Sequence, residues 1–273
     1  MAGINAIITR AFDLFFAPFA HASPWLGLAA VSLLSGIVLL VVFRYTSNQR
    51  AIRGTKDRII AHLLEVVLYR DELGVVLRAQ VGVIRDSLRY LAHALVPLAC
   101  MALPVGTLLV QVDLRYGRRP LRLKERAVVA VKLRADRGSL DSVALLVPEG
   151  VELQTPGLRI PAAREVDWRI AATARGSYDL RVVAEGAAVT KRLVVGSGRA
   201  CTSAERVRGG LAQQFLHPAE PPLPYRGVVE SIRISYPASS LSLFRWRIHW
   251  IWPWLILSTA FGYALRGPLR VQV

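Results

Sequence analysis

The chain contains few cysteines and few histidines for its 273 residues. Cys100 and Cys201 are the only cysteines, which are too few for a disulfide-stapled scaffold or a cysteine-rich zinc module. The five histidines, at positions 21, 62, 93, 217 and 249, have no spacing that would gather metal ligands. We therefore expect neither a bound metal nor a cofactor.

Catalytic and nucleotide-binding motifs are also missing. The sequence has no Gly-x-Ser-x-Gly element, no phosphate-binding glycine-rich loop and no dinucleotide fingerprint, so we do not expect an enzyme. Acidic residues are scarce: 35 Lys and Arg against 19 Asp and Glu give a net charge of +16. The basic residues are not interleaved with aromatic residues on a nucleic-acid-binding fold. Anionic lipid is a simpler partner for this charge than nucleic acid.

The chain is rich in apolar residues. Hydrophobic residues make up 53% of it and are concentrated in three blocks, and the mean hydropathy is +0.37. The first block covers 26–43 without a charge and ends at Arg44, the second covers 91–112, and the third runs from the tryptophans of 246–254 to Leu265. A transmembrane helix needs roughly 20 such residues. We predict three transmembrane helices; the alternative for each block is a buried core helix.

The N-terminal segment has the period of an amphipathic helix. Its polar residues Asn5, Thr9, Arg10 and Asp13 lie on one side. The apolar residues on the other side are Ile4, Ile7, Ile8, Phe12, Phe15, Phe16 and Phe19. Such a helix lies in the membrane interface. The alternative is a signal peptide cleaved after residues 20–22, although no positive charge precedes Arg10.

Residues 44–90 are basic and amphipathic. Apolar residues follow a period of 3.6 over 59–68 and, less regularly, over 73–91. Asp71, Glu72 and Gly74 provide a bend, which predicts a hairpin of two short amphipathic helices; the alternative is one helix lying on the surface. Part of the charge is paired locally, because three acidic residues stand at helical spacing from basic ones: Asp57, Glu65 and Asp86. The apolar face needs a partner, which is the membrane, the spans or a client segment.

After residue 120 the apolar period changes from 3.6 to 2. The predicted strands are 127–133, 142–147, 166–170, 178–183, 189–195 and 228–236. Turn residues separate the first five strands, at the short spacing that is typical of an antiparallel β-sandwich. Trp168 is the expected core anchor. Without a cysteine pair, the resulting all-β module is immunoglobulin-like in architecture only.

The chain is thus predicted to be an α-helical membrane protein with an inserted β-sandwich. Residues 1–112 hold the interfacial helix, the first span, the hairpin and the second span. Residues 113–245 form the β-module with its proline-rich connection, and 246–273 form the third span and a short tail. Three spans put the hairpin and the C-terminus on one side of the membrane. Nine basic residues in 44–90 favour the cytoplasm for the hairpin, but six in 113–126 conflict with the positive-inside rule.

The order of these elements resembles the YidC/Oxa/Get insertase superfamily, particularly the branch that includes a core subunit of the endoplasmic-reticulum membrane protein complex. The resemblance covers residues 1–112 and 246–266. It implies an N-terminus outside, a cytoplasmic hairpin, and spans that enclose a polar groove through which a client helix slides into the bilayer. Location in a bacterial inner membrane, with the β-module outside, goes with this interpretation.

Two departures from the family stand out. Its bacterial members often hold a basic residue within the groove, whereas the first span here has none and Arg44 is the nearest. The inserted β-module suggests an added extracytoplasmic binding role. Arg44, Arg50 and Arg53 are candidates for contact with lipid or with an acidic client flank.

The candidate groove-lining residues are the polar side chains in or beside the spans: Ser32, Ser35, His93, Gln111, Ser258 and Thr259. Polar groups within a membrane usually face a bundle interior or a wet cavity. The alternative for the serines and the threonine is a hydrogen bond to their own helix backbone, and for His93 it is packing at the interface. Cys100 is expected to pack in a span, and Cys201 to be a lone thiol at the edge of the β-module.

Three functional hypotheses follow. The first is an insertase or membrane chaperone that acts on client membrane helices. The second is a membrane-anchored structural or interaction protein whose β-sandwich binds an envelope partner. The third is a subunit of a transporter or secretion complex. The sequence determines neither the client nor the oligomeric state.

Overall fold

The computed structural model describes residues 2–19, 22–47, 49–198, 200–243 and 246–267. The alternative cleavage site at 20–22 therefore lies partly outside the described residues. The chain divides into two compact units. The first comprises Met1–Leu28 and Leu109–Pro253, and the second comprises Ala29–Leu108 and Trp254–Val273.

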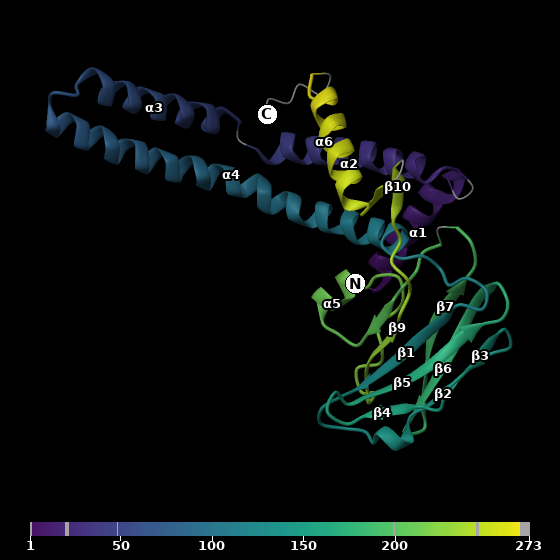
Figure 1. The fold of residues 1–273 in the computed structure, drawn as a ribbon. Coiled ribbons are helices and arrows are strands. Elements are labelled where there is room, and N and C mark those ends of the chain that lie inside the picture. The colour runs from purple at the N-terminus through teal and green to yellow at the C-terminus, as the bar shows by residue number, and fades with distance from the viewer. Residues whose placement is uncertain (1, 20–21, 48, 199, 244–245, 268–273) are drawn as a thin grey trace. The chain divides into compact units, whose positions relative to one another are not determined.

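The first two apolar blocks lie entirely within helices, and the third is helical from residue 251 onward. In chain order they are α1 (Ala2–Phe16), the short 3-10 turn η1 (Ala17–Phe19), α2 (Pro24–Thr46), α3 (Gln49–Leu68), α4 (Leu73–Tyr116), the 3-10 turn η2 (Leu140–Ser142), α5 (Leu211–Leu216) and α6 (Ile251–Leu265) (Figure 1). Both α2 and α4 are long and apolar enough to cross a membrane. α6 has 15 residues, which is about 22 Å at a rise of 1.5 Å per residue and shorter than a hydrocarbon core.

The third predicted span therefore begins later than expected. Residues 246–248 form a strand rather than the start of a helix, because they pair with Leu241–Leu243. The helix begins at Ile251, and Pro253 falls in its first turn, where a missing N–H has no intrahelical partner to lose.

The predicted bend in the amphipathic segment is confirmed. α3 ends at Leu68 and α4 begins at Leu73, and Figure 1 shows α3 lying alongside the first half of α4. The expected boundary between the hairpin and the second span at residue 91 is not found, because both belong to one helix of 44 residues. Residues 85–96 contain no glycine or proline that would interrupt it. At about 66 Å this helix is twice as long as a hydrocarbon core is thick, so half of it must lie outside such a core.

The six predicted strands are all present, and five short ones were missed. The strands are β1 (Arg126–Leu133), β2 (Ala144–Leu146), β3 (Val151–Leu153), β4 (Leu158–Ile160), β5 (Glu165–Ala172), β6 (Gly176–Ala184), β7 (Ala187–Val195), β8 (Glu205–Val207), β9 (Val229–Ile234), β10 (Leu241–Leu243) and β11 (Trp246–Ile248). β3, β4, β8, β10 and β11 have three residues each, which is too short for alternation to be visible in sequence.

Two antiparallel sheets form the β-module. One has the order β3-β5-β1-β9-β8, with β4 also paired to β5, and the other has the order β2-β6-β7. Their buried side chains belong to one apolar cluster, in which Val131 and Ile170 come from the larger sheet and Leu180 and Leu193 from the smaller. Trp168 lies in this cluster, as predicted. Full burial of each large aliphatic side chain contributes roughly 1.5–3 kcal/mol, so this shared core holds the sheets together.

A carboxylate clamp stabilises the start of the module. Both Nη atoms of Arg119 donate to the carboxylate of Glu125 at 2.7 Å, and the backbone N–H of Arg122 donates to it at 2.8 Å. The hydrogen bonds from Arg119 lower the pKa of Glu125 to about 2 from an ordinary 4.5. The clamp is therefore fully formed above about pH 4.5 and is lost as the pH falls toward 2.

Replacing Glu125 with Gln is expected to lower the free energy of unfolding by about 2 kcal/mol at pH 7, after allowance for partial solvent screening. The difference from the native protein should shrink as the pH falls from 4.5 to 2. Unfolding of the full-length protein in detergent, followed across this pH range, measures it. Glu185→Gln, at an exposed position whose side chain has no ion pair or hydrogen bond among the described residues, should change neither the free energy of unfolding nor its pH dependence. If the native protein and Glu125→Gln differ in stability as much at pH 2 as at pH 7, the lowered pKa of Glu125 is not the source of the effect.

Candidate functional site

The α3–α4 hairpin buries polar and small residues between its two helices. Thr55, Ala79, Gly82 and Asp86 are its buried positions on this inner side. His62 lies over Gly82 so closely that an added Cβ would stand 2.8 Å from the imidazole ring. Helix contact at this point thus depends on the absence of a side chain at Gly82.

The outer side of the same hairpin is apolar and exposed. Its exposed large apolar residues are Ile60, Leu63, Leu64, Val67, Leu68, Leu73, Leu77, Val81, Ile84, Leu88, Leu91 and Leu95. Soluble monomers rarely leave so large a set of apolar side chains together on one element. The hairpin is therefore inverted relative to a soluble helix pair, with polar groups inside and apolar groups outside.

Asp86 is the charged centre of the hairpin and is 0% exposed. Arg89 Nη1 donates to its Oδ1 at 3.3 Å. Its Oδ2 stands 3.7 Å from Nε of Arg58 and 3.5 Å from Nε2 of His62, both on α3. Oδ2 has no hydrogen-bond partner among the described residues. Asp86 thus joins the two helices through charge rather than through well-directed hydrogen bonds.

α4 carries an open apolar hollow on its outer side. The hollow has a volume of about 560 Å³, and its lining residues are Val81, Ile84, Arg85, Leu88, Arg89 and Ala92. Four of these side chains are apolar, and two are arginines that are more than half exposed. An apolar floor with basic edges suits a hydrophobic segment with an acidic flank.

Two predicted groove residues lie where α2 meets α6 within the second unit. Ser35 Oγ donates to Val31 O at 2.7 Å and accepts from Trp254 Nε1 at 3.1 Å. Ser258 Oγ donates to Leu255 O at 3.1 Å. Both serines therefore use the carbonyls of their own helix, which was the alternative expectation for them. The helices approach closely here, since a Cβ on Gly36 would lie 3.1 Å from Ser258 O.

The other predicted groove residues do not share this environment. Ser32 is fully buried in α2, and its Oγ has no hydrogen-bond partner among the described residues. His93 and Thr259 are exposed on α4 and α6. Gln111 belongs to the first unit. Of the candidate basic residues, Arg44 and Arg53 are exposed, and the side chain of Arg50 is outside the described part of the structure.

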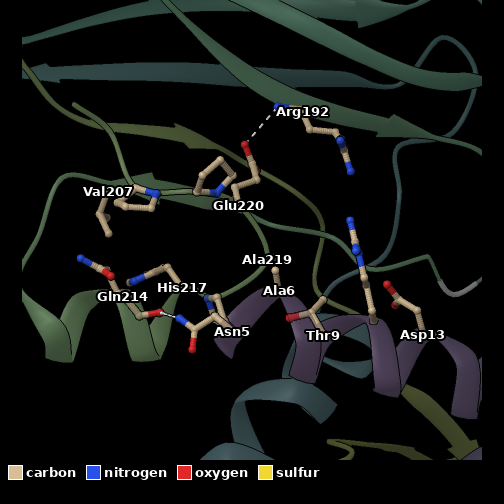
Figure 2. A pocket seen from close by; sticks show the side chains of 14 residues that line it. Asn5, Ala6, Thr9, Asp13, Arg192, Val207, Gln214, His217, Ala219 and Glu220 are labelled. Atoms are coloured by element: carbon tan, nitrogen blue, oxygen red, sulfur yellow. Dashed lines mark hydrogen bonds between the residues drawn. The ribbon is translucent and has the colours of Figure 1, made fainter. Parts of the chain in front are cut away.

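Gln111 instead belongs to a polar clamp between α1 and the end of α4. Its Nε2 donates to Thr9 Oγ1 at 3.1 Å, and its Oε1 accepts from Arg115 Nη1 at 3.1 Å. Arg115 is only 2% exposed, and its Nη2 also donates to Thr9 O at 3.2 Å and to Asp13 Oδ1. The polar side of α1 therefore faces the protein, as Figure 2 also shows for Asn5, Thr9 and Asp13.

The predicted N-terminal helix is confirmed, but its predicted apolar side is divided: the rings of Phe12 and Phe16 lie against Arg115, whereas Ile4 and Ile7 face outward. Ile4, Ile7 and Leu14 are all more than half exposed. Like the hairpin, α1 has polar contacts inside and apolar side chains outside. This distribution is typical of a helix whose outer surface meets lipid.

Comparison with known proteins finds no match for this chain. No family model matches it, and no curated protein or solved structure matches it at a significant level. The function must therefore be inferred from the arrangement of the residues alone.

Sequence reasoning missed the clamp residue Arg115 and the buried pair of Lys191 and Glu220. Lys191 is 0% exposed; its Nζ donates to Ser203 O at 2.8 Å, to Ser203 Oγ at 3.1 Å and to Glu220 Oε1. Burial lowers the pKa of Lys191. A signal was present, because the period of 2 in β7 puts residue 191 on the same face as Leu193 and Val195. No comparable pattern in the sequence indicates that Arg115 is buried.

Cys201 is half-buried within the first unit and forms no disulfide with a described residue. Burial raises the pKa of this thiol. A thiol with a raised pKa reacts slowly with maleimides, because the thiolate is the reacting form. Topology is therefore better measured at engineered cysteines on exposed positions than at Cys201.

Proposed function

We propose that this chain is an integral membrane protein with an insertase-like function. It assists the insertion or folding of client membrane helices through the α3–α4 hairpin and a polar groove between its spans. In this proposal α2, α4 and α6 lie in the membrane, the hairpin is cytoplasmic, and the β-module is an extracytoplasmic domain of immunoglobulin-like architecture.

The inverted hairpin is the observation that carries the proposal. Its charged centre at Asp86 holds α3 and α4 together, so its apolar outer face is available to a third partner. The charges at Arg78, Arg85 and Arg89 keep this half of α4 out of the hydrocarbon core. An apolar face held just outside a membrane can receive a hydrophobic segment before that segment enters the lipid.

Polar groups within the spans support the second half of the proposed mechanism. The buried hydroxyl of Ser32 lacks a hydrogen-bond partner among the described residues, and a buried polar group without a partner is costly unless water or a client supplies one. Water at Ser32 would lower the cost of moving the polar flank of a client past α2. The exposed Arg44 and Arg53 would attract an acidic flank to the entrance.

Site-specific crosslinking tests this function in the full-length protein. A photoreactive amino acid at Leu88, which is 62% exposed on the outer face of α4, is expected to crosslink to a stalled nascent chain that carries one transmembrane helix. Leu88→Glu should lower the insertion of that client severalfold, because a charge on the apolar floor opposes binding of an apolar segment. Carbonate extraction of the client measures insertion.

The matched control is Leu146→Glu, which changes an equally apolar residue that is 52% exposed on β2. It should leave insertion unchanged. The same photoreactive residue at position 146 should not reach the nascent chain. If depletion of the protein leaves every client inserted and no position from 59 to 95 crosslinks, the insertase function is wrong.

The orientation of the protein in the membrane is measured in the same strain. In the Cys100→Ser, Cys201→Ser variant, a single cysteine replaces either Arg70 at the hairpin tip or Ala188 in the β6–β7 hairpin; both positions are exposed. A membrane-impermeant maleimide applied to spheroplasts should label position 188 and spare position 70. The reverse pattern would put the hairpin outside and would remove the insertase proposal.

A second candidate function rests on the β-module. A basic cavity of about 400 Å³ lies in it, and its lining residues are Arg119, Pro120, Arg122, Leu123, Arg175, Gly196, Ser197 and Gly198. Such a surface could receive an acidic envelope partner while the spans serve only as an anchor. Crosslinks from Arg175 to one stoichiometric partner, with none from Leu88 to nascent chains, would support this alternative.

A further inference from the structure

A cavity of about 400 Å³ lies between α1, α5 and the proline-rich segment of the first unit (Figure 2). Its lining residues are Asn5, Ala6, Thr9, Arg10, Asp13, Arg192, Val207, Gln214, His217, Pro218, Ala219, Glu220, Pro221 and Pro222. The size is that of sites for small ligands or lipid headgroups. None of these residues belongs to the hairpin or to the spans.

Its two carboxylates are neutralised by buried cations that do not line the cavity. Asp13 binds Arg115, and Glu220 binds Lys191. Neither carboxylate is therefore left to balance the arginines of the cavity wall.

The cationic groups of the wall remain available. Arg10 on α1 and Arg192 on β7 are exposed, and neither side chain has an ion pair or hydrogen bond among the described residues. Figure 2 shows Arg192 extending from its strand toward α1. Two guanidinium groups from separate elements thus border one polar cavity without an acidic partner. The two positive charges repel each other when the cavity is empty, and an anion bound between them offsets this repulsion.

Neutral donors in the wall complete the pattern. Thr9 Oγ1 accepts from Gln111, and its own hydroxyl donates no hydrogen bond among the described residues. Asn5 Nδ2 uses one of its two protons on Gln214 O at 2.7 Å. A hydroxyl, an amide and two guanidinium groups match the oxygens of a phosphate group, which accept several hydrogen bonds at once.

We propose that this cavity binds a phosphate group, with Arg10 and Arg192 as its principal ligands. The phosphodiester of an anionic phospholipid headgroup is the favoured source. The reason is that Ile7 and Leu14, three residues before and four residues after Arg10 on the same helix, are exposed beside it, so acyl chains would lie against an apolar surface. The proposal goes beyond the insertase function and does not depend on it.

Ligand titration of the full-length protein in a non-ionic detergent tests the site. The probes are short-chain phosphatidylglycerol, short-chain phosphatidylcholine and inorganic phosphate, and calorimetry measures affinity. Phosphatidylglycerol should bind. Arg10→Gln and Arg192→Gln should each weaken its binding about tenfold, as expected for loss of one charge-assisted contact, and the double variant should weaken it further. Arg181→Gln, an exposed arginine of β6 outside the cavity, is the matched control and should bind as the native protein does.

The outcomes separate the sources of the phosphate. Binding of phosphatidylglycerol alone, lost in the double variant, supports a lipid site. Binding of inorganic phosphate with the same dependence on Arg10 and Arg192 supports a phosphate site with a soluble ligand. Absence of binding by every probe, or equal binding by the native protein and the double variant, overturns the proposal. A circular dichroism spectrum identical to that of the native protein shows that the variants are folded.

Discussion

Replacing Glu220 with Gln is expected to lower the free energy of unfolding by about 3 kcal/mol at neutral pH. Among the described residues, Glu220 is the carboxylate bonded to the ammonium group of Lys191, which is 0% exposed. The substitution leaves that ammonium group buried without a counter-charge, with only neutral acceptors: the two oxygens of Ser203 and the new side-chain amide oxygen. Chemical unfolding of the full-length protein in detergent, followed by tryptophan fluorescence, measures the loss.

The pH dependence identifies the cause of that loss. Burial lowers the pKa of Lys191 from an ordinary 10.5, so between the folded and unfolded pKa values the unfolded chain binds more protons. Stability therefore rises with pH in that window. Glu220→Gln removes the favourable charge partner and lowers the pKa of Lys191 further, so the rise in stability begins at a lower pH and is larger in total.

A double variant provides the control. Lys191→Met removes the buried charge, so the combination of Lys191→Met and Glu220→Gln should recover most of the stability that Glu220→Gln loses. It should also lack the alkaline rise. If the double variant is as unstable as the sum of the two single variants, the buried pair is not the source of the effect.

Removal of Asp86 is the second large expected effect, and it acts on the hairpin. Asp86→Ala should destabilise the packing of α3 against α4 by about 2 kcal/mol. A buried ion pair that loses one partner costs about 3–5 kcal/mol, and solvent screening of arginines that are more than half exposed reduces this figure. The remaining cations, Arg58, Arg85 and Arg89, would then repel one another around an empty site.

Hydrogen exchange of α3 measures this opening directly. The amides of residues 55–65 should lose protection by about 30-fold, which corresponds to about 2 kcal/mol of local opening free energy. The matched control is Asp71→Ala at the hairpin tip, where the carboxylate is 95% exposed and its pairing with Arg70 contributes little. Equal protection in both variants would show that Asp86 does not hold the hairpin closed.

The same variant relates the hairpin to the proposed function. If the apolar outer face is presented to clients by a closed hairpin, Asp86→Ala should reduce crosslinking from Leu88 while Asp71→Ala leaves it intact. Stability and client contact would then fall together, as expected for a scaffold that presents a surface.

Local periodicity accounts for the elements that could be predicted. Alternation over at least six residues located β1, β5, β6, β7 and β9, and a period of 3.6 located α1 and α3. The bend at Asp71 and Glu72 was visible because acidic residues and Gly74 interrupt the apolar period. Five of the six three-residue strands and the helix α5 escaped, because so few residues do not establish a period.

The candidate site was only partly predictable. Ser35 and Ser258 came together between α2 and α6, but Gln111 turned out to hold α1 through Arg115. A spacing of four residues on α4 places Gln111 and Arg115 on one side, and nothing in the sequence pairs that side with Thr9 and Asp13 some 100 positions earlier. Contacts at this separation depend on the fold as a whole.

The sequence by itself determined which residues share a face in α1, in the hairpin and in most strands. The tertiary structure decided which face turns inward. In α1 and in the hairpin the polar face is the inner one, because Arg115 and Asp86 find their counter-charges there. The period of apolar residues in a sequence shows only that two faces of an element differ. Which partner each face contacts depends on the charges and apolar groups that the fold places opposite it. That choice leaves the apolar faces outside, where lipid or a client can meet them.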